Sequence, residues 1–401
     1  MSDQNHHPRC GIKNLWLQAG ENYYAYSIHL NRAEVLDLVG DWQESLAVLD
    51  RSNAFAKKAG ARKQEADSEI KRIRLLRYMG KNRDFLDPLN RAMATYTELG
   101  DQYGMNQALN EVGLAYRFSG NILKAEECFI DLIARSEKND DPKHLMSGLG
   151  NLSQIHTLNG KYEQALRCLD RCMKISQSQD DNTFSTILLG SIGNAYFYMD
   201  KLDLALDHYQ KQLQLAYKYG DLANISVAVG NIGNIHNRHG DFDRALECYR
   251  EKLEFSQKLG YATGILQALG NMGLALTELG DLTEARGCFE RQLVVSREAN
   301  DPEGIEGACS GLGEIFTQMT DYTRAEEYFK LAIAVDIEHG LQNELAMNYL
   351  GLAEMYLKKG DADLAKKTAG LALAAAQEAG NEELAVKATR LQEKPFKARK
   401  R

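Results

Sequence analysis

The chain has 401 residues, of which 44% are apolar and 26% charged, with a net charge of −8. This composition is that of a soluble globular protein with a core, and it excludes intrinsic disorder and small disulfide scaffolds. No stretch approaches twenty apolar residues and the first ten residues lack the apolar segment of a secretory signal, so we expect a cytoplasmic protein without membrane insertion.

Glycines recur at fixed spacing along the chain. In rows of forty they form two columns, offset by twenty residues. One column holds Gly40, Gly80, Gly120, Gly160, Asp200, Gly240, Gly280, Thr320 and Gly360, and the other holds Gly20, Gly60, Gly100, Asp140, Asp180, Gly220, Gly260, Asn300, Gly340 and Gly380. Gly, Asn and Asp tolerate the left-handed conformation that follows a helix end. The spacing therefore predicts a helix stop every twenty residues, which is typical of a solenoid of helix pairs.

The elements expected in chain order follow from this period. We expect residues 1–20 to form an extension, helical repeats to fill 21–380, a capping helix to cover 381–392 and a basic tail to cover 393–401. The nine repeat units are 21–60, 61–100, 101–140, 141–180, 181–220, 221–260, 261–300, 301–340 and 341–380. In the second unit Pro88 would lie inside a helix, at a cost of about 3 kcal/mol, so we expect that helix to begin late, at Asp87-Pro88, or to kink.

The unit near residue 230 resembles the tetratricopeptide repeat (TPR). The signature positions are Ile232-Gly233, His236, Gly240, Phe242, Ala245 and Tyr249. The forty-residue form is similar to the repeats of Pins/LGN-type spindle-orientation scaffolds and to the TPR arms of bacterial signalling ATPases and cyclases. The resemblance implies an all-α, right-handed superhelical solenoid in which the first helix of each pair, helix A, lines the concave wall.

The resemblance also indicates where a partner would bind. Polar residues gather in the helix A columns that the family uses as its groove, between residues 151 and 318. The candidate binding residues are Asn151, Gln154, Asn194, Tyr198, Asn231, Asn234, Asn237, Arg238, Asn271, Thr277 and Glu314. Asn carries both a donor and an acceptor, so it can pair with the main chain of an extended peptide. The alternative is that these amides bond within or between neighbouring helices.

Charge narrows the class of ligand. The two-carboxylate clamp of chaperone-tail TPR domains needs Lys or Arg in the columns of Val227 and Asn231, and only Lys71 meets this requirement. The last eight residues carry five positive charges, which leaves −13 on the rest of the chain. An acidic solenoid is poorly suited to nucleic acid.

No catalytic, cofactor or metal motif is recognisable. Gly80-Lys81 and Gly160-Lys161 lack the upstream glycine of a phosphate loop. Cys168 and Cys172 could touch a metal, but they have no second ligand pair nearby in the sequence, so packing is the preferred interpretation. We therefore expect no enzyme, no cofactor and no metal site.

The sequence predicts a non-enzymatic scaffold that binds a peptide or helix of another protein in the concave TPR groove. Two alternatives stay open. One is a sensory or regulatory arm that controls a signalling effector. The other is an RNA-binding helical repeat, which the acidic composition disfavours.

Overall fold

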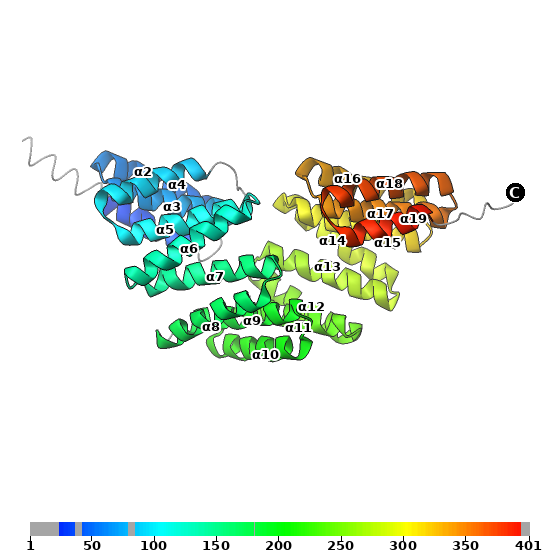
Figure 1. The fold of residues 1–401 in the computed structure, drawn as a ribbon, viewed down its shortest axis with the longest axis horizontal. Helices are drawn as coiled ribbons and strands as arrows, with labels where there is room; N and C mark the ends of the chain where they lie inside the picture. Colours follow the sequence, from blue (N-terminus) through cyan, green and yellow to red (C-terminus); the bar gives the residue numbers. More distant parts are fainter. Residues whose placement is uncertain (1–23, 37–41, 79–84, 180, 394–401) are drawn as a thin grey trace, which may run out of the picture. The chain divides into compact units, whose positions relative to one another are not determined.

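The structure, a computed structural model, describes residues 24–36, 42–78, 85–179 and 181–393. These residues form helices joined by tight turns, and no strand occurs among them (Figure 1). A helix over residues 24–36 precedes α2. The following helices are α2 (Trp42–Ala59), α3 (Arg62–Tyr78), α4 (Leu86–Leu99), α5 (Gln102–Phe118), α6 (Ile122–Lys138), α7 (Pro142–Leu158), α8 (Tyr162–Ser178), α9 (Asn182–Tyr198), α10 (Leu202–Tyr219), α11 (Leu222–Arg238), α12 (Phe242–Lys258), α13 (Ala262–Leu279), α14 (Leu282–Ala299), α15 (Pro302–Gln318), α16 (Tyr322–His339), α17 (Gln342–Lys359), α18 (Ala362–Glu378) and α19 (Glu382–Glu393). Odd-numbered helices up to α17 are the A helices, and even-numbered ones are the B helices.

The turns explain the twenty-residue period. Every described residue of the two glycine columns has a positive φ, including the non-glycine members Asp140, Asp200, Asn300 and Thr320. The residue after the turn then caps the next helix. Asp241, for example, donates its backbone N–H to the His236 carbonyl at 2.9 Å, and its carboxylate accepts from the Arg244 N–H. A left-handed stop followed at once by an N-cap joins two helices with minimal linker.

Helix α4 begins late. Phe85 is its N-cap and is buried, and Pro88 lies in the first turn, where the missing N–H removes no helical hydrogen bond. Leu89 and Tyr96 of the same helix are fully buried. The late start that Pro88 predicts is therefore confirmed, and the shortened helix still contributes to the core.

Small residues let the helices pack closely. The alanine column of the B helices is completely buried, and its members are Ala125, Ala165, Ala205, Ala245, Ala285, Ala325 and Ala365. Phe289 of α14 occupies the space left by Gly273 of α13 and Gly311 of α15, since a Cβ at either glycine would lie within 2.6 Å of the ring. These contacts confirm the predicted all-α solenoid of stacked helix pairs.

The chain divides into two compact units, Met1–Lys201 and Leu202–Arg401. In the first unit, α3, α5, α7 and α9 contact one another in succession, and in the second, α11, α13, α15, α17 and α19 do so. Among the described residues no B helix makes comparable contact with the next B helix. Neighbouring A helices are thus closer together, so in each unit they form the inner wall of the curve.

Several expectations lie outside the described residues. The extension over 1–20, the glycine-column positions Gly40, Gly80 and Asp180, and the tail from 394 onward are among them. Within the described part of the chain, no helix combines the length and the apolar character that crossing a bilayer requires.

Candidate functional site

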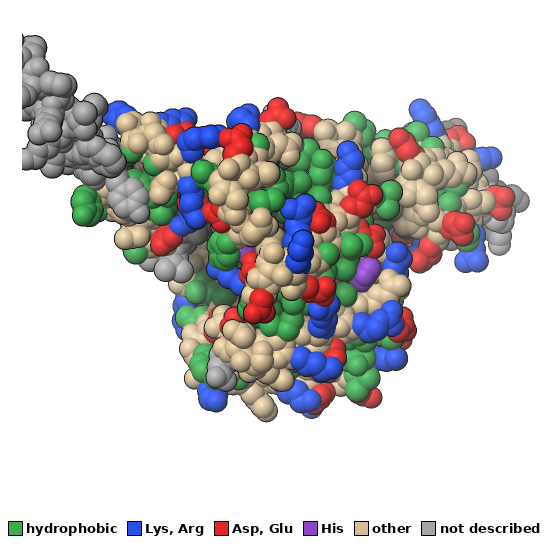
Figure 2. Space-filling view, turned by 60° about the vertical axis from the view of Figure 1, so that its left-hand side comes forward, with side chains coloured by type: hydrophobic (Ala, Val, Ile, Leu, Met, Phe, Trp, Pro, Cys, Tyr) green, Lys and Arg blue, Asp and Glu red, His purple; other side chains and the backbone are tan. Residues whose placement is uncertain are grey.

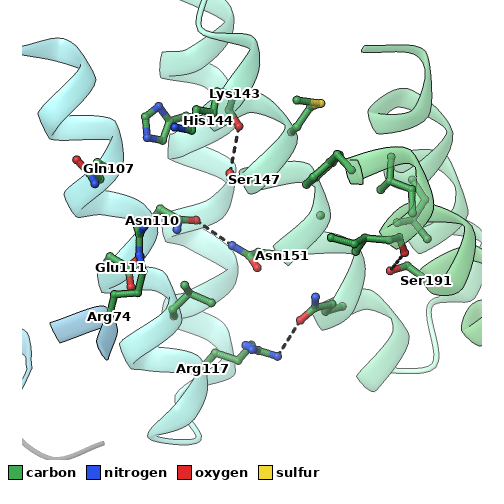
Figure 3. Close-up of a pocket in the computed structure, with 18 of the residues that line it drawn as sticks. Arg74, Gln107, Asn110, Glu111, Arg117, Lys143, His144, Ser147, Asn151 and Ser191 are labelled. Carbon is green, nitrogen blue, oxygen red and sulfur yellow. Dashed lines mark hydrogen bonds and ion pairs between the residues drawn. The ribbon is translucent and has the colours of Figure 1, made fainter. Parts of the chain in front are cut away.

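The first unit has a hollow of about 470 Å³, lined by the A helices α3, α5, α7 and α9 (Figure 3). On the face drawn in Figure 2, Lys, Arg, Asp and Glu side chains are interspersed among scattered hydrophobic ones. The polar side chains that matter most in the hollow are the amides of Gln107, Asn110, Asn151 and Gln154 and the cations of Arg74, Arg77, Arg117 and Lys143.

Amide side chains connect neighbouring A helices across the hollow. Asn151 of α7 donates from Nδ2 to Oδ1 of Asn110 of α5 at 2.8 Å. Arg117 of α5 donates to Oε1 of Gln154 of α7 at 2.9 Å. The bonded residues are 37 and 41 positions apart, which is close to the repeat length of forty residues, so each bond joins equivalent helices of adjacent repeats. The amide column therefore bridges adjacent repeats and is also accessible from the hollow.

One buried carboxylate faces the cations. Glu111 has a side-chain exposure of 2%, and its two oxygens accept from Nε of Arg74 at 3.2 Å and from a terminal nitrogen of Arg77 at 3.3 Å. No other carboxylate lines the hollow among the described residues, so four cations face one anion. Because like charges in one hollow repel, this arrangement favours a bound anion.

Arg117 has no carboxylate partner among the described residues. Its guanidinium lies 4.6 Å from the ring centroid of Phe118, and that of Arg77 lies 5.6 Å from the same centroid. Partial burial, together with the positive charge of Arg77, lowers the pKa of Arg117. Arg117 Nε is buried without a hydrogen-bond partner in the described structure.

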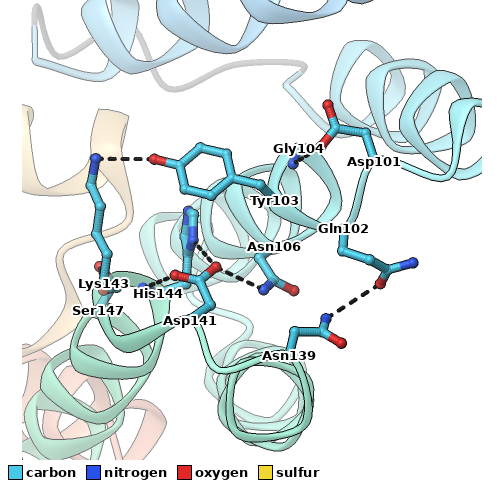
Figure 4. Close-up of polar contacts among 10 residues, drawn as sticks. All are labelled: Asp101, Gln102, Tyr103, Gly104, Asn106, Asn139, Asp141, Lys143, His144 and Ser147. Carbon is cyan, nitrogen blue, oxygen red and sulfur yellow. Dashed lines mark hydrogen bonds and ion pairs between the residues drawn. The ribbon is translucent and has the colours of Figure 1, made fainter.

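The edge of the hollow near the start of α5 and α7 is held by a polar cluster (Figure 4). His144 Nδ1 lies 2.6 Å from Oδ2 of Asp141, and Asn106 donates to the same oxygen at 3.1 Å. The His144 ring contacts the edge of Tyr103 at a centroid distance of 4.6 Å, and Lys143 donates to the Tyr103 hydroxyl at 3.1 Å. Lys143 thus has a neutral partner and keeps its charge available.

The second unit has a smaller hollow, of about 230 Å³, between α15 and α17. Its charged residues are Glu314, Glu354 and Lys358, so the excess charge here is negative. Glu314 is accessible to solvent, but the walls of the hollow desolvate it, and this desolvation together with the charge of Glu354 raises the pKa of its carboxyl.

Asparagines of the second unit bond to one another between α11 and α13. Asn234 Oδ1 accepts from the Tyr249 hydroxyl at 2.9 Å and from Nδ2 of Asn271 at 3.1 Å. Nearby, Lys252 of α12 is buried and donates to Oε1 of Gln267 at 2.8 Å, and burial lowers its pKa to about 8. A Cβ on Gly230 would meet the Lys252 side chain, so the glycine makes room for it.

Profile comparison decides the family. The tetratricopeptide repeat profile matches residues 104–178, 183–258 and 264–338, which is more than half of the chain, and a second TPR profile matches 27–51. The chain belongs to the tetratricopeptide repeat family. No curated protein is similar enough in sequence to count as a match.

Solved structures share the TPR fold at low identity. The apo form of RapI has a TM-score of 0.59 and 12% identity, covering 89% of this chain and 99% of its own. The apo form of the quorum sensor NprR from B. thuringiensis has a TM-score of 0.59 and 14% identity, covering 85% and 98%. The Rap conjugation gene regulator of plasmid pLS20, in complex with the Phr* peptide, has a TM-score of 0.57 and 16% identity, covering 88% and 98%. At these identities the likeness establishes the fold.

The structure distributes the residues predicted from the TPR columns over both units. Asn151 and Gln154 line the hollow of the first unit, and in the same unit Tyr198, which is 61% exposed, stacks on Tyr162 at 6.5 Å. Asn194, on α9, is exposed. Each of these four residues therefore has a surface open to solvent.

In the second unit the predicted residues divide into three groups. Asn234 and Asn271 bond to each other, and the Thr277 hydroxyl donates to the Gly273 carbonyl of its own helix at 2.7 Å. Glu314 lines the smaller hollow. The remaining predicted residues lie on α11, where Asn231 and Asn237 are partly buried and Arg238 is exposed.

Sequence reasoning missed the cations of the first unit. Arg74 occupies the same TPR column as Gln154, Asn194 and Asn234, and Arg77 and Arg117 share the column of Asn237. Arg74 and Arg77 lie in the repeat at 61–100, which departs most from the signature. Arg117 lies in the next repeat, and all three precede the range 151–318 in which the sequence places the groove.

The described residues contain no group of three or more His, Cys, Asp or Glu side chains placed to hold a metal ion. Burial raises the pKa of the described cysteines Cys168 and Cys172, the second to about 12, which favours the packed thiol over a thiolate ligand. The TPR wall of the described residues can offer hydrogen bonds and charge to a ligand.

Proposed function

We propose that this TPR protein is a non-enzymatic binding module that holds a peptide segment of a partner protein against its A helices, chiefly in the hollow of the first unit. The observation that carries the proposal is the hollow of about 470 Å³ lined by four consecutive A helices with amide side chains at its centre. A hollow of this size accommodates a few side chains of an extended segment.

The central amide pair is suited to a peptide group. Asn110 and Asn151 satisfy each other with one hydrogen bond, which leaves Nδ2 of Asn110 and Oδ1 of Asn151 without a partner among the described residues. One donor and one acceptor side by side match the carbonyl and N–H of a peptide main chain. The exposed amides Gln154 and Asn194 would extend the same wall.

The solved relatives support this class of ligand. The pLS20 Rap regulator was solved with the Phr* peptide, and NprR is described as a quorum sensor. A regulatory role, in which peptide binding controls an effector, is the second candidate, and the NprR likeness favours it. The asparagine row of the second unit, with Asn231, Asn234 and Asn237, is proposed as a further contact surface of that unit.

The test is to select, from a displayed library of linear peptides, those that bind the purified full chain. Asn110→Ala combined with Asn151→Ala should weaken the selected peptides at least about tenfold, because both main-chain partners are removed. Gln164→Ala, an amide removed from the exposed face of α8, is the matched control and should bind like the wild type. If the double variant binds with unchanged affinity, the peptide lies elsewhere and the proposal is wrong.

A further inference from the structure

The hollow of the first unit is positively charged in a protein whose net charge is −8. Four cationic side chains and one carboxylate line it. Many cations elsewhere in the described structure have a carboxylate partner of their own, either within one helix or on a neighbouring helix. A hollow with more cations than carboxylates, on an acidic chain, is a specific feature of these repeats and does not follow from the composition.

Two of the four cations are already neutralised in part. Glu111, buried between them, accepts from both Arg74 and Arg77. A ligand anion at these two guanidiniums would have to compete with a carboxylate that is fixed in place. The charge available to a ligand is therefore that of Arg117 and Lys143.

Arg117 is prepared for an anion. Its only described side-chain acceptor is the neutral amide of Gln154, and a guanidinium has five N–H donors. Packing against Phe118 orients the guanidinium plane, so little side-chain entropy is left to lose on binding. The guanidinium of Arg77 lies near the same Phe118 ring and adds positive potential at Arg117. An anionic ligand would balance this potential, whereas a neutral ligand would not.

This inference rests on the proposed function. We propose that this hollow selects peptides with acidic side chains, of which one carboxylate is bound by Arg117, while Lys143, at the other end of the hollow (Figure 3), attracts a second. A carboxylate can accept two parallel bonds from one guanidinium, which gives both affinity and orientation. The amide pair Asn110 and Asn151 would hold the adjoining main chain.

A peptide carboxylate fits the hollow better than a nucleic acid. The buried Glu111 would repel a chain of phosphates, and the strongly acidic remainder of the protein would do so over a longer range. The hollow is also confined to four helices and does not form a long basic stripe.

The experiment uses three synthetic peptide pools of equal length, identical except for pairs of Glu, Gln or Lys at the same fixed positions. Binding to the full chain is measured by fluorescence anisotropy at low and at physiological salt. The Glu pool should bind at least about tenfold more tightly than the Gln pool, a difference of about 1.4 kcal/mol, and the Lys pool more weakly than either. Added salt should reduce the preference for Glu.

The variants locate the effect. Arg117→Gln should abolish the preference for Glu while leaving the Gln pool bound as before, and Lys143→Gln should reduce it severalfold. Lys174→Gln, on α8, makes the same change in net charge at an exposed ion pair and should have no effect. Circular dichroism melting confirms that the variants are folded.

The outcomes separate the two proposals. Equal binding of the Glu and Gln pools would overturn the acidic-peptide inference and leave peptide binding standing. A preference for Glu that survives Arg117→Gln would also overturn it. If no pool binds, both proposals fail. If single-stranded polynucleotide displaces the Glu pool and binds more tightly, the hollow is a phosphate site and the inference is wrong.

Discussion

The hollows of the two units are built alike and charged oppositely. In the first unit, cations from α3, α5 and α7 face a single buried carboxylate, Glu111. In the second, Glu314 and Glu354 face only Lys358. The scaffold in both is the same TPR wall of A helices, so the repeat fold leaves charge free to vary. The comparison teaches that the charge can change along one TPR column, which holds Arg74, Gln154, Asn234 and Glu314 at equivalent positions.

The largest expected effect tests whether Glu111 is the internal counter-ion of the basic hollow. Glu111→Ala should destabilise the protein by about 3 kcal/mol, because it removes the buried carboxylate that Arg74 and Arg77 share. Urea denaturation measures the loss. Glu314→Ala, the removal of an accessible carboxylate in the other hollow, is the control, and its effect should stay within about 1 kcal/mol. Equal losses would remove the contrast between the hollows.

The second unit should lose stability as pH rises, owing to a buried acidic pair beneath its wall. Asn348 donates to Glu306 at 2.7 Å and to Asp336 at 2.9 Å, and burial raises the pKa of Glu306 to about 7 and that of Asp336 to about 6. A carboxyl with a raised pKa in the folded state binds its proton more tightly there than in the unfolded chain. The contribution of Asp336 is therefore present at low pH and lost as pH rises through about 3.8 to 6, and that of Glu306 is lost through about 4.5 to 7.

Glu306→Gln should flatten this dependence and stabilise the protein at pH 8 by about 2 kcal/mol. Thermal melts at a series of pH values measure the slope. Glu338→Gln, on the exposed face of α16, should leave the slope unchanged. A wild-type protein that becomes more stable between pH 5 and pH 8 would contradict the assigned shifts.

Backbone strain in the second unit allows a substitution that changes the stability of the protein without changing its charge. Thr320 has a φ of 63°, where a β-branched residue is disfavoured, and it lies in the turn after α15, two residues beyond Gln318 of the acidic hollow. Thr320→Gly should stabilise the protein by about 1 kcal/mol or somewhat less, since the relief of strain exceeds the added entropy of the unfolded chain. Differential scanning calorimetry would detect it. The preference for Glu-containing peptides should not change in this variant. A changed preference would mean that the stability of the protein, and not only the charge of the hollows, affects peptide selection.

The smallest expected effect tests repulsion within the acidic hollow. Glu314→Gln should stabilise the protein by a few tenths of a kcal/mol at pH 7, because it removes the like charge beside Glu354. The gain should disappear in high salt, which screens the pair. Urea midpoints at two salt concentrations provide the measurement, and a gain that is independent of salt would contradict the electrostatic origin.

Much of the fold could be predicted from the sequence because local chemistry specifies it. The left-handed stop and the Asp cap are set within a few residues, and Pro88 alone moves the start of α4. The site was predicted less completely. Asn151 and Gln154 were named and lie in the hollow, but Arg117 was not, because its importance depends on the absence of a carboxylate contributed by other helices.

The sequence by itself determined the period, the helix boundaries and the alternation of A and B helices, since turn and cap residues act through the adjacent backbone. The tertiary structure decided which charges are neutralised. Glu111 reaches Arg74 and Arg77 on a helix more than thirty residues earlier, whereas Arg117 meets only an amide. That difference depends on how three A helices pack side by side, because ion pairing requires the charged atoms to lie within a few ångströms of one another.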